Sequence, residues 1–145
     1  MTILLLQIPL VLVILASSVT GVVAVATPNS IVTEKAAAWL ARCSSGNWDW
    51  SQFGPTPDSV PPTPETRRAV VELFRKTLAP FGEMRSILLT SAHTYTSDEG
   101  YRRTAYRYAV TMSRGSIKYV FALDSDGFVG GFSITTSAGT ISYSR

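Results

Sequence analysis

Apolar and polar residues alternate along much of the stretch from residue 83 to residue 136. In its second segment, 103–112, Tyr106 and Tyr108 occupy even-numbered positions, whereas charged and small residues occupy the odd-numbered positions. A period of two predicts strands with one face buried and the other in water. The tail either frays or adds an edge strand through Ile141 and Tyr143. We expect four consecutive strands, near 84–95, 103–112, 117–123 and 128–135.

Two earlier segments show helical spacing instead. Apolar residues recur every three or four positions in 31–44 and in 64–79. Thr63 and Pro64 supply an N-cap and a first-turn proline for the second helix. The connection between the helices comprises a short helical turn and a proline-rich loop, at 48–53 and 54–62.

Helices followed by a run of antiparallel strands predict an α+β fold. We expect the helices to pack on one strongly curved antiparallel sheet of four or more strands. Gly130 and Gly131 stand inside the last predicted strand. Glycines at such a place mark a bend or bulge, so this pair predicts where the sheet curls around a helix.

The first 26 residues predict a targeting segment. An apolar run from Ile3 to Ala16 is followed by small and polar residues and then by Ala24-Val25-Ala26, which fits a signal-peptidase site before Thr27. The same region is long enough to remain as an uncleaved membrane anchor. Both alternatives place 27–145, a single domain, outside the cytoplasm: secreted, periplasmic or at the cell surface, or anchored in the membrane.

Charge and cysteine content narrow the function classes. The net charge is +3, and the basic residues are scattered, so we expect no nucleic-acid partner. Arg103, Arg107 and Lys118 lie on the polar face of adjacent predicted strands and form a candidate basic stripe for anionic cell-envelope material. One cysteine, Cys43, excludes an internal disulfide, and with one histidine we expect neither a metal nor another cofactor.

Three segments carry a resemblance to a known family: GNWDWSQF at 46–53, LFRKTLAPFGEMRSI at 73–87 and YVFALDSDGFVGGFSI at 119–134. In order and spacing they resemble small exported members of the nuclear-transport-factor-2-like (cystatin-like cone) superfamily, over roughly 36–135. The resemblance implies a cone-shaped fold, often with a pocket, and an accessory, non-catalytic role beside cell-envelope enzymes. Family members often pair through the open sheet face, so a homodimer is one expected partner arrangement.

The enzymatic branch of that superfamily implies an Asp or Asp-His base and a tyrosine donor in the pocket. The candidates here are Asp49, His93, Tyr106 and Tyr108, each of which also has a plain structural interpretation as turn, surface or core residue. The residues that we expect to line a pocket are Trp39, Trp48, Trp50, Phe74, Tyr106, Tyr108 and Phe121.

Two functions stay open. The first is an extracytoplasmic, non-catalytic binding or interaction module for a small apolar ligand or a protein partner. The second is a small isomerase or cyclase-type enzyme. Asp49 or His93 in an enclosed pocket, within hydrogen-bond reach of a tyrosine, would favour the enzyme. An interior filled by Trp39, Phe74 and other aromatic rings would favour the module.

Overall fold

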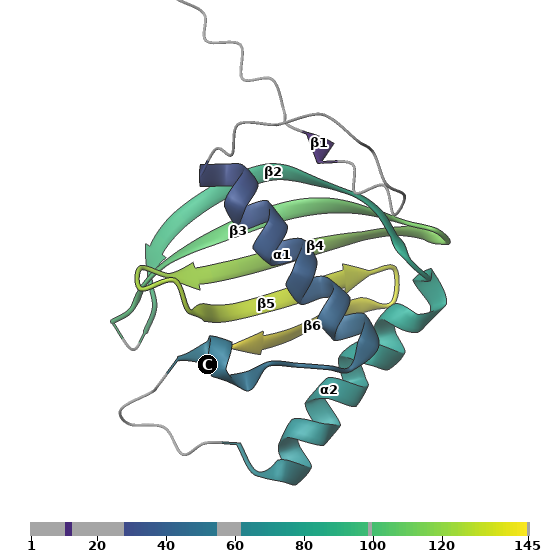
Figure 1. Cartoon of the computed structure of the whole chain (residues 1–145), viewed down its shortest axis with the longest axis horizontal. Helices are drawn as coiled ribbons and strands as arrows, with labels where there is room; N and C mark the ends of the chain where they lie inside the picture. Colours follow the sequence, from purple (N-terminus) through teal and green to yellow (C-terminus); the bar gives the residue numbers. More distant parts are fainter. Residues whose placement is uncertain (1–10, 13–27, 55–61, 99, 145) are drawn as a thin grey trace, which may run out of the picture.

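The computed structural model describes residues 11–12, 28–54, 62–98 and 100–144. Its strands form one antiparallel sheet in sequence order, with two α-helices on one face (Figure 1). The strands are β1 (Val11–Leu12), β2 (Met84–Thr96), β3 (Arg102–Met112), β4 (Gly115–Asp124), β5 (Val129–Thr136) and β6 (Gly139–Ser144). The α+β prediction is therefore confirmed, and the tail forms the edge strand β6.

The helices begin and end close to the predicted positions. They are α1 (Pro28–Ser45) and α2 (Pro64–Leu78), with short 3-10 turns η1 (Trp50–Phe53) and η2 (Ala79–Phe81). Thr63 caps α2, because its side-chain oxygen accepts a hydrogen bond from the Thr66 backbone N–H at 3.2 Å. Figure 1 shows α1 crossing the face of the sheet, with α2 beside its C-terminal half.

The core fills the space between this helical layer and the sheet. Trp39 of α1, Phe74 of α2 and Phe121 of β4 are almost completely buried. Ring centroids lie 4.8 Å apart between Phe74 and Phe132 and 5.1 Å apart between Trp39 and Phe53. Contacts at these separations are typical of closely packed aromatic pairs, so the interior at this end of the sheet is occupied by the protein's own side chains.

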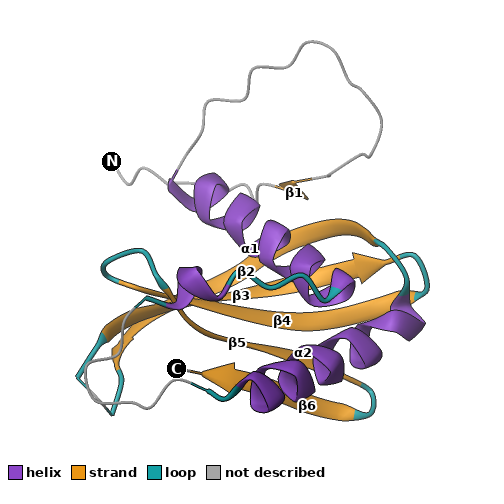
Figure 2. Cartoon of the chain, turned by 60° about the horizontal axis from the view of Figure 1, so that its bottom comes forward, coloured by secondary structure: helices purple, strands orange, loops and turns teal. Residues whose placement is uncertain are grey.

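The shape of the sheet differs from the expectation. Figures 1 and 2 show a twisted sheet without the strong curl or cone shape that we predicted. The predicted irregularity at Gly130 is present: Ala122 pairs with Gly131 and Leu123 with Val129, which leaves Gly130 as an extra residue in β5. The glycine pair therefore makes a local bulge.

The predicted targeting segment, residues 1–26, lies outside the described residues apart from β1, whose Val11 and Leu12 pair with Leu88 and Ile87 of β2. The central part of the proline-rich loop, 55–61, lies outside them as well. No helix in the described part of the chain has both the length and the apolar composition needed to cross a membrane.

Candidate functional site

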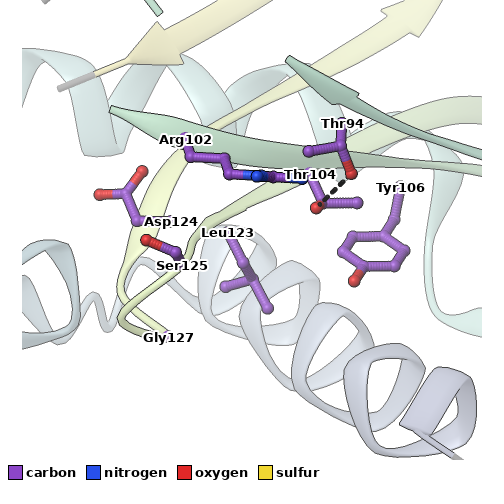
Figure 3. Close-up of a pocket in the computed structure, with 8 residues that line it drawn as sticks. All are labelled: Thr94, Arg102, Thr104, Tyr106, Leu123, Asp124, Ser125 and Gly127. Carbon is purple, nitrogen blue, oxygen red and sulfur yellow. Dashed lines mark hydrogen bonds between the residues drawn. The ribbon is translucent and has the colours of Figure 1, made fainter. Parts of the chain in front are cut away.

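A groove of about 360 Å³ opens on the helix-covered face, at the end of the sheet where β3 begins and β4 ends (Figure 3). The strand register places its residues side by side: Thr94 of β2 pairs with Thr104 of β3, and Thr104 pairs with Leu123 of β4. The lining residues are Thr94, Arg102, Thr104, Tyr106, Leu123, Asp124, Ser125 and Gly127.

Most of the residues that line the groove carry a hydrogen-bonding side chain. The hydroxyls of Thr94 and Thr104 are hydrogen-bonded at 3.0 Å, as the dashed line in Figure 3 shows. Leu123 and Tyr106 point toward α1 in the same view, and Leu123 is the one aliphatic side chain larger than threonine in the lining. Hydroxyls donate and accept, whereas the guanidinium of Arg102 only donates and is always charged, so the lining is suited to a polar ligand with negative charge.

A lysine of α1 fixes the turn beside the groove. The Lys35 ammonium donates a hydrogen bond to the Gly127 carbonyl oxygen at 2.6 Å. Gly127 has a φ of 85°, in the left-handed region that glycine adopts most readily. Within the turn, the Gly127 backbone N–H bonds the Asp124 carbonyl oxygen at 2.9 Å. The predicted hairpin turn is thus confirmed, and α1 holds it in place.

A buried ion pair lies behind the groove and corrects one prediction. Arg103 Nε donates to Asp124 Oδ1 at 2.7 Å, and the two residues are only 5% and 7% exposed. Arg103 therefore does not belong to an exposed basic stripe, because Asp124 faces it across β3 and β4 and neutralises its charge. Arg107 and Lys118 remain exposed on that face.

Because glycine has no Cβ atom, Gly130 leaves room for this ion pair. A Cβ atom at Gly130 would lie 2.6 Å from Arg103 Nε and 2.7 Å from Asp124 Oδ1, closer than van der Waals contact allows. The Arg103 guanidinium also lies 5.7 Å from the centre of the Tyr101 ring. The bulge at Gly130 thus serves to house a charged pair at low exposure, and a buried pair requires such close partners.

The four catalytic candidates do not come together in one site. Tyr106 lines the groove, but the neighbouring Tyr108 is buried, and its hydroxyl lies 3.3 Å from the hydroxyl of Thr33 on α1. Burial raises the pKa of Tyr108 to about 12. Tyr108 is therefore a neutral core residue that ties β3 to α1.

Asp49 and His93 lie outside the groove. Asp49 caps η1, and its carboxylate accepts hydrogen bonds from the hydroxyl and the backbone N–H of Ser51, at 2.6 and 3.2 Å. The hydroxyl bond is the main cause of the lowered pKa of Asp49. His93 is exposed on β2 and lies parallel to the Tyr95 ring, with centroids 6.3 Å apart.

The residues predicted to line one pocket fall into three places. Trp39, Phe74, Tyr108 and Phe121 lie in the core, Tyr106 lies in the groove, and Trp48 and Trp50 line a separate cleft beside α2. As site residues, sequence reasoning missed Thr94, Arg102, Thr104, Leu123, Asp124, Ser125 and Gly127. One signal for the groove was present in the sequence. On the buried face of β3, apolar residues give way to Thr104 close to the end of the strand.

The described residues support neither a metal site nor a reactive thiol. In the described part of the chain, no three His, Cys, Asp or Glu side chains are placed to hold a metal ion. Cys43 is buried, and burial raises the pKa of its thiol, which keeps it protonated and unreactive. No family model, curated protein or solved structure matches this chain.

Proposed function

We propose that this protein is an extracytoplasmic, non-catalytic binding module that holds a small anionic ligand in the groove. The observation that carries the proposal is the lining itself: one guanidinium, from Arg102, with the hydroxyls of Thr94, Thr104, Tyr106 and Ser125. Guanidinium groups bind carboxylates and phosphates through two parallel hydrogen bonds, and hydroxyls add further donors. An anion entering this groove would meet donors from two strands, β2 and β3, and from the turn after β4.

The groove lacks a free general base among its described lining residues. Its one carboxylate, Asp124, is paired with Arg103 at 2.7 Å. General acid–base catalysis requires a titratable group within hydrogen-bond reach of the substrate. Binding without chemical conversion is the simpler use of such a lining. The aromatic interior also favours a polar ligand in the groove over the small apolar ligand expected from the sequence, because the apolar space is filled.

One feature supports the alternative of an isomerase or cyclase-type enzyme. Tyr106 presents its phenol to the groove, and a tyrosine hydroxyl is a suitable donor to a developing oxyanion. Such an enzyme would need a base brought by the substrate or by a residue outside the described lining. We place this function second for that reason.

The remaining parts of the proposal rest on sequence. The resemblance to nuclear-transport-factor-2-like proteins supports an accessory role beside cell-envelope proteins. The apolar N-terminal segment supports export with a cleaved signal peptide, or retention by a membrane anchor. A protein partner or a second copy of the chain would use the sheet face opposite the helices. Determining the mature N-terminus in the membrane and soluble fractions tests the export proposal.

The binding proposal is tested with two matched variants of the full-length protein. Wild type, Arg102→Gln and Arg107→Gln are titrated calorimetrically with a panel of small dicarboxylates and phosphate monoesters. Both variants remove one exposed arginine, but only Arg102 lines the groove. We expect at least one anion to bind wild type and Arg107→Gln alike and to bind Arg102→Gln about tenfold more weakly, equivalent to ~1.4 kcal/mol. Equal weakening in both variants, or no binding to wild type, would overturn the proposal.

A further inference from the structure

A second concave site lies between the connection after α1 and the first half of α2. Its volume is about 510 Å³, larger than that of the groove. Aromatic rings come from the connection, and cationic side chains come from α2. The lining residues are Gly46, Asn47, Trp48, Trp50, Arg67, Arg68, Val71 and Glu72. We call this site the Trp-Arg cleft.

The aromatic wall of the Trp-Arg cleft is held rigidly. The rings of Trp48 and Trp50 lie 5.2 Å apart between centroids, and their planes are inclined by 36°. Tyr143 of β6 lies 5.8 Å from each of these two rings, and Phe132 lies 5.1 Å from Trp48. Because the rings are packed from behind, a ligand that contacts them meets a surface already in place, which lowers the entropy cost of binding.

Cationic groups complete the cleft. The Arg67 guanidinium lies 4.8 Å from the centre of the Trp50 ring, a cation–π contact. Arg68 has a long ion pair with Glu65, at 3.9 Å with both side chains more than three-quarters exposed, and its Nε donates a long hydrogen bond to the Pro64 carbonyl oxygen at 3.4 Å. Such an exposed pair contributes little and leaves Arg68 able to bind an anion.

The acidic residue of the cleft is already engaged. Glu72 accepts a hydrogen bond from Arg75 Nε at 2.8 Å, and this contact is the main cause of its lowered pKa. Glu72 therefore does little to neutralise Arg67 and Arg68. The cleft combines an aromatic wall with two positive charges.

Two buried N–H groups of the cleft residues lack a hydrogen-bond acceptor within the described part of the chain. Trp48 Nε1 and Arg67 Nε are buried and have no hydrogen-bond partner among the described residues. A buried donor without an acceptor destabilises the folded protein. A ligand that brings oxygen acceptors into the cleft, with a small adjustment of these side chains, would relieve that destabilisation.

We propose that the Trp-Arg cleft binds a carboxylate-bearing pyranose unit of an acidic polysaccharide. The polarised C–H groups of a pyranose ring pack against aromatic rings as other positive groups do, here against the part of the wall that the Arg67 guanidinium does not cover. Its carboxylate matches the fork of the Arg68 guanidinium, and its ring and hydroxyl oxygens are acceptors for the unpaired N–H groups. Single-stranded nucleic acid fits less well, because it is bound by a continuous cationic track, and this cleft has two cations.

The proposal is tested by calorimetric titration of the full-length protein with oligogalacturonate and with its fully methyl-esterified form. The two ligands have the same rings and differ in charge. We expect oligogalacturonate to bind with salt-sensitive affinity and the ester to bind about tenfold more weakly or not at all. Equal binding of the two forms, absence of oligogalacturonate binding, or tighter binding of a single-stranded oligonucleotide would overturn the proposal.

Matched variants locate the site. Arg68→Gln changes an exposed side chain and should weaken oligogalacturonate binding about tenfold, equivalent to ~1.4 kcal/mol. Arg107→Gln, on the opposite sheet face, should bind as wild type does. Trp50→Ala should abolish binding, provided that its circular dichroism spectrum is native. Loss in Arg102→Gln with Arg68→Gln unaffected would assign the saccharide to the groove and reject the Trp-Arg cleft.

Discussion

The two ends of the helix-covered sheet face are built differently, although α1 runs over both. Toward β5 and β6, the rings of Trp39, Trp48, Phe74 and Phe132 contact one another, with centroids from 4.8 to 5.6 Å apart. Toward the start of β3 the same face has hydroxyls around a groove of about 360 Å³. The filled end supplies apolar burial, the main favourable term in folding, so the open end is free to hold a ligand.

The difference follows from which residues the strands place on that face. Along β3, Val110 and Met112 are buried at the end far from the groove, whereas Thr104 is half-buried in the groove. Hydroxyl-bearing residues gain little from burial and keep their hydrogen-bonding capacity. A sheet of this kind separates stability from binding along its length, and the two ends should respond differently to substitution.

Phe132→Ala should produce the largest effect, because Phe132 is at the centre of the filled end. Its ring lies within 5.6 Å of the rings of Phe74, Trp48 and Trp39. Truncating a buried phenylalanine costs about 3–5 kcal/mol, through lost burial and the cavity left behind. Chemical denaturation followed by fluorescence measures the change in unfolding free energy.

The control for this substitution is Leu123→Ala at the groove. Leu123 is only half-buried, and its loss enlarges a space that is already open. We expect a smaller cost than for Phe132→Ala. An equal or greater cost would show that the groove end contributes to the core as strongly as the aromatic end does, and the contrast between the two ends would fail.

Gly130→Val should come next, with a loss of about 3 kcal/mol or more. The new side chain would enter the space of Arg103 and Asp124 and separate a buried ion pair, which is costly because it leaves charges without partners. Gly131→Val should also destabilise, since its Cβ would lie 2.9 Å from the Tyr143 carbonyl oxygen. Thermal unfolding measures both effects.

Ser133→Val, on the same strand, tests whether any valine would do the same. Ser133 is half-buried and regularly paired with Val120 and Ser142, so valine suits its extended backbone. We expect little change in melting temperature. If Ser133→Val lowers it as much as Gly130→Val, the close contact with the ion pair is not the cause.

The sequence predicted the elements well because their signals are local. Alternation marked β3, and Thr63-Pro64 marked the start of α2 within a residue. The bulge at Gly130 was also predictable, since few other reasons place two glycines in a strand. What sits against that bulge was not predictable: the pairing of Arg103 with Asp124 depends on the register between β3 and β4.

The candidate site was harder to predict for a related reason. Its residues come from three strands and a turn, and each is an ordinary threonine, arginine or serine in the sequence. We predicted instead that aromatic residues line the pocket, but Trp39, Phe74 and Phe121 fill the core. Tyr106 alone joined the groove, because it lies two residues closer to the open end than Tyr108 does.

Alkaline pH should destabilise the filled end through its buried tyrosines. Burial raises the pKa of Tyr108 from 10.0 to about 12, and it raises the pKa of Tyr119 as well. The folded state thus holds these protons more tightly than the unfolded state does. The contribution of Tyr108 is fully present below pH 10 and is lost as the pH rises toward 12.

Urea unfolding between neutral pH and pH 12 measures this loss of stability, and Tyr108→Phe should make the decline shallower. Removing the hydroxyl takes away a 3.3 Å hydrogen bond with Thr33, so the variant starts slightly less stable at neutral pH, by about 1 kcal/mol. Tyr95→Phe, at an exposed tyrosine, is the control and should leave the slope unchanged. Identical slopes in all three proteins would contradict the assignment to Tyr108.

Thr104→Val should have the smallest effect on stability and a clear effect on binding. Valine keeps the shape of the side chain but loses the 3.0 Å hydrogen bond to Thr94, whose hydroxyl is exposed and turns to water instead. We expect a change in unfolding free energy below about 1 kcal/mol. Thr135→Val breaks an equivalent threonine pair between β5 and β6, at 2.8 Å and away from the groove. If the open end is built for binding, the two variants unfold alike in denaturant, and only Thr104→Val weakens the binding of the anion proposed to contact Arg102. If Thr104→Val alone lowered the unfolding free energy by more than ~2 kcal/mol, the groove would contribute substantially to stability. Stability and binding would then not be separated between the two ends.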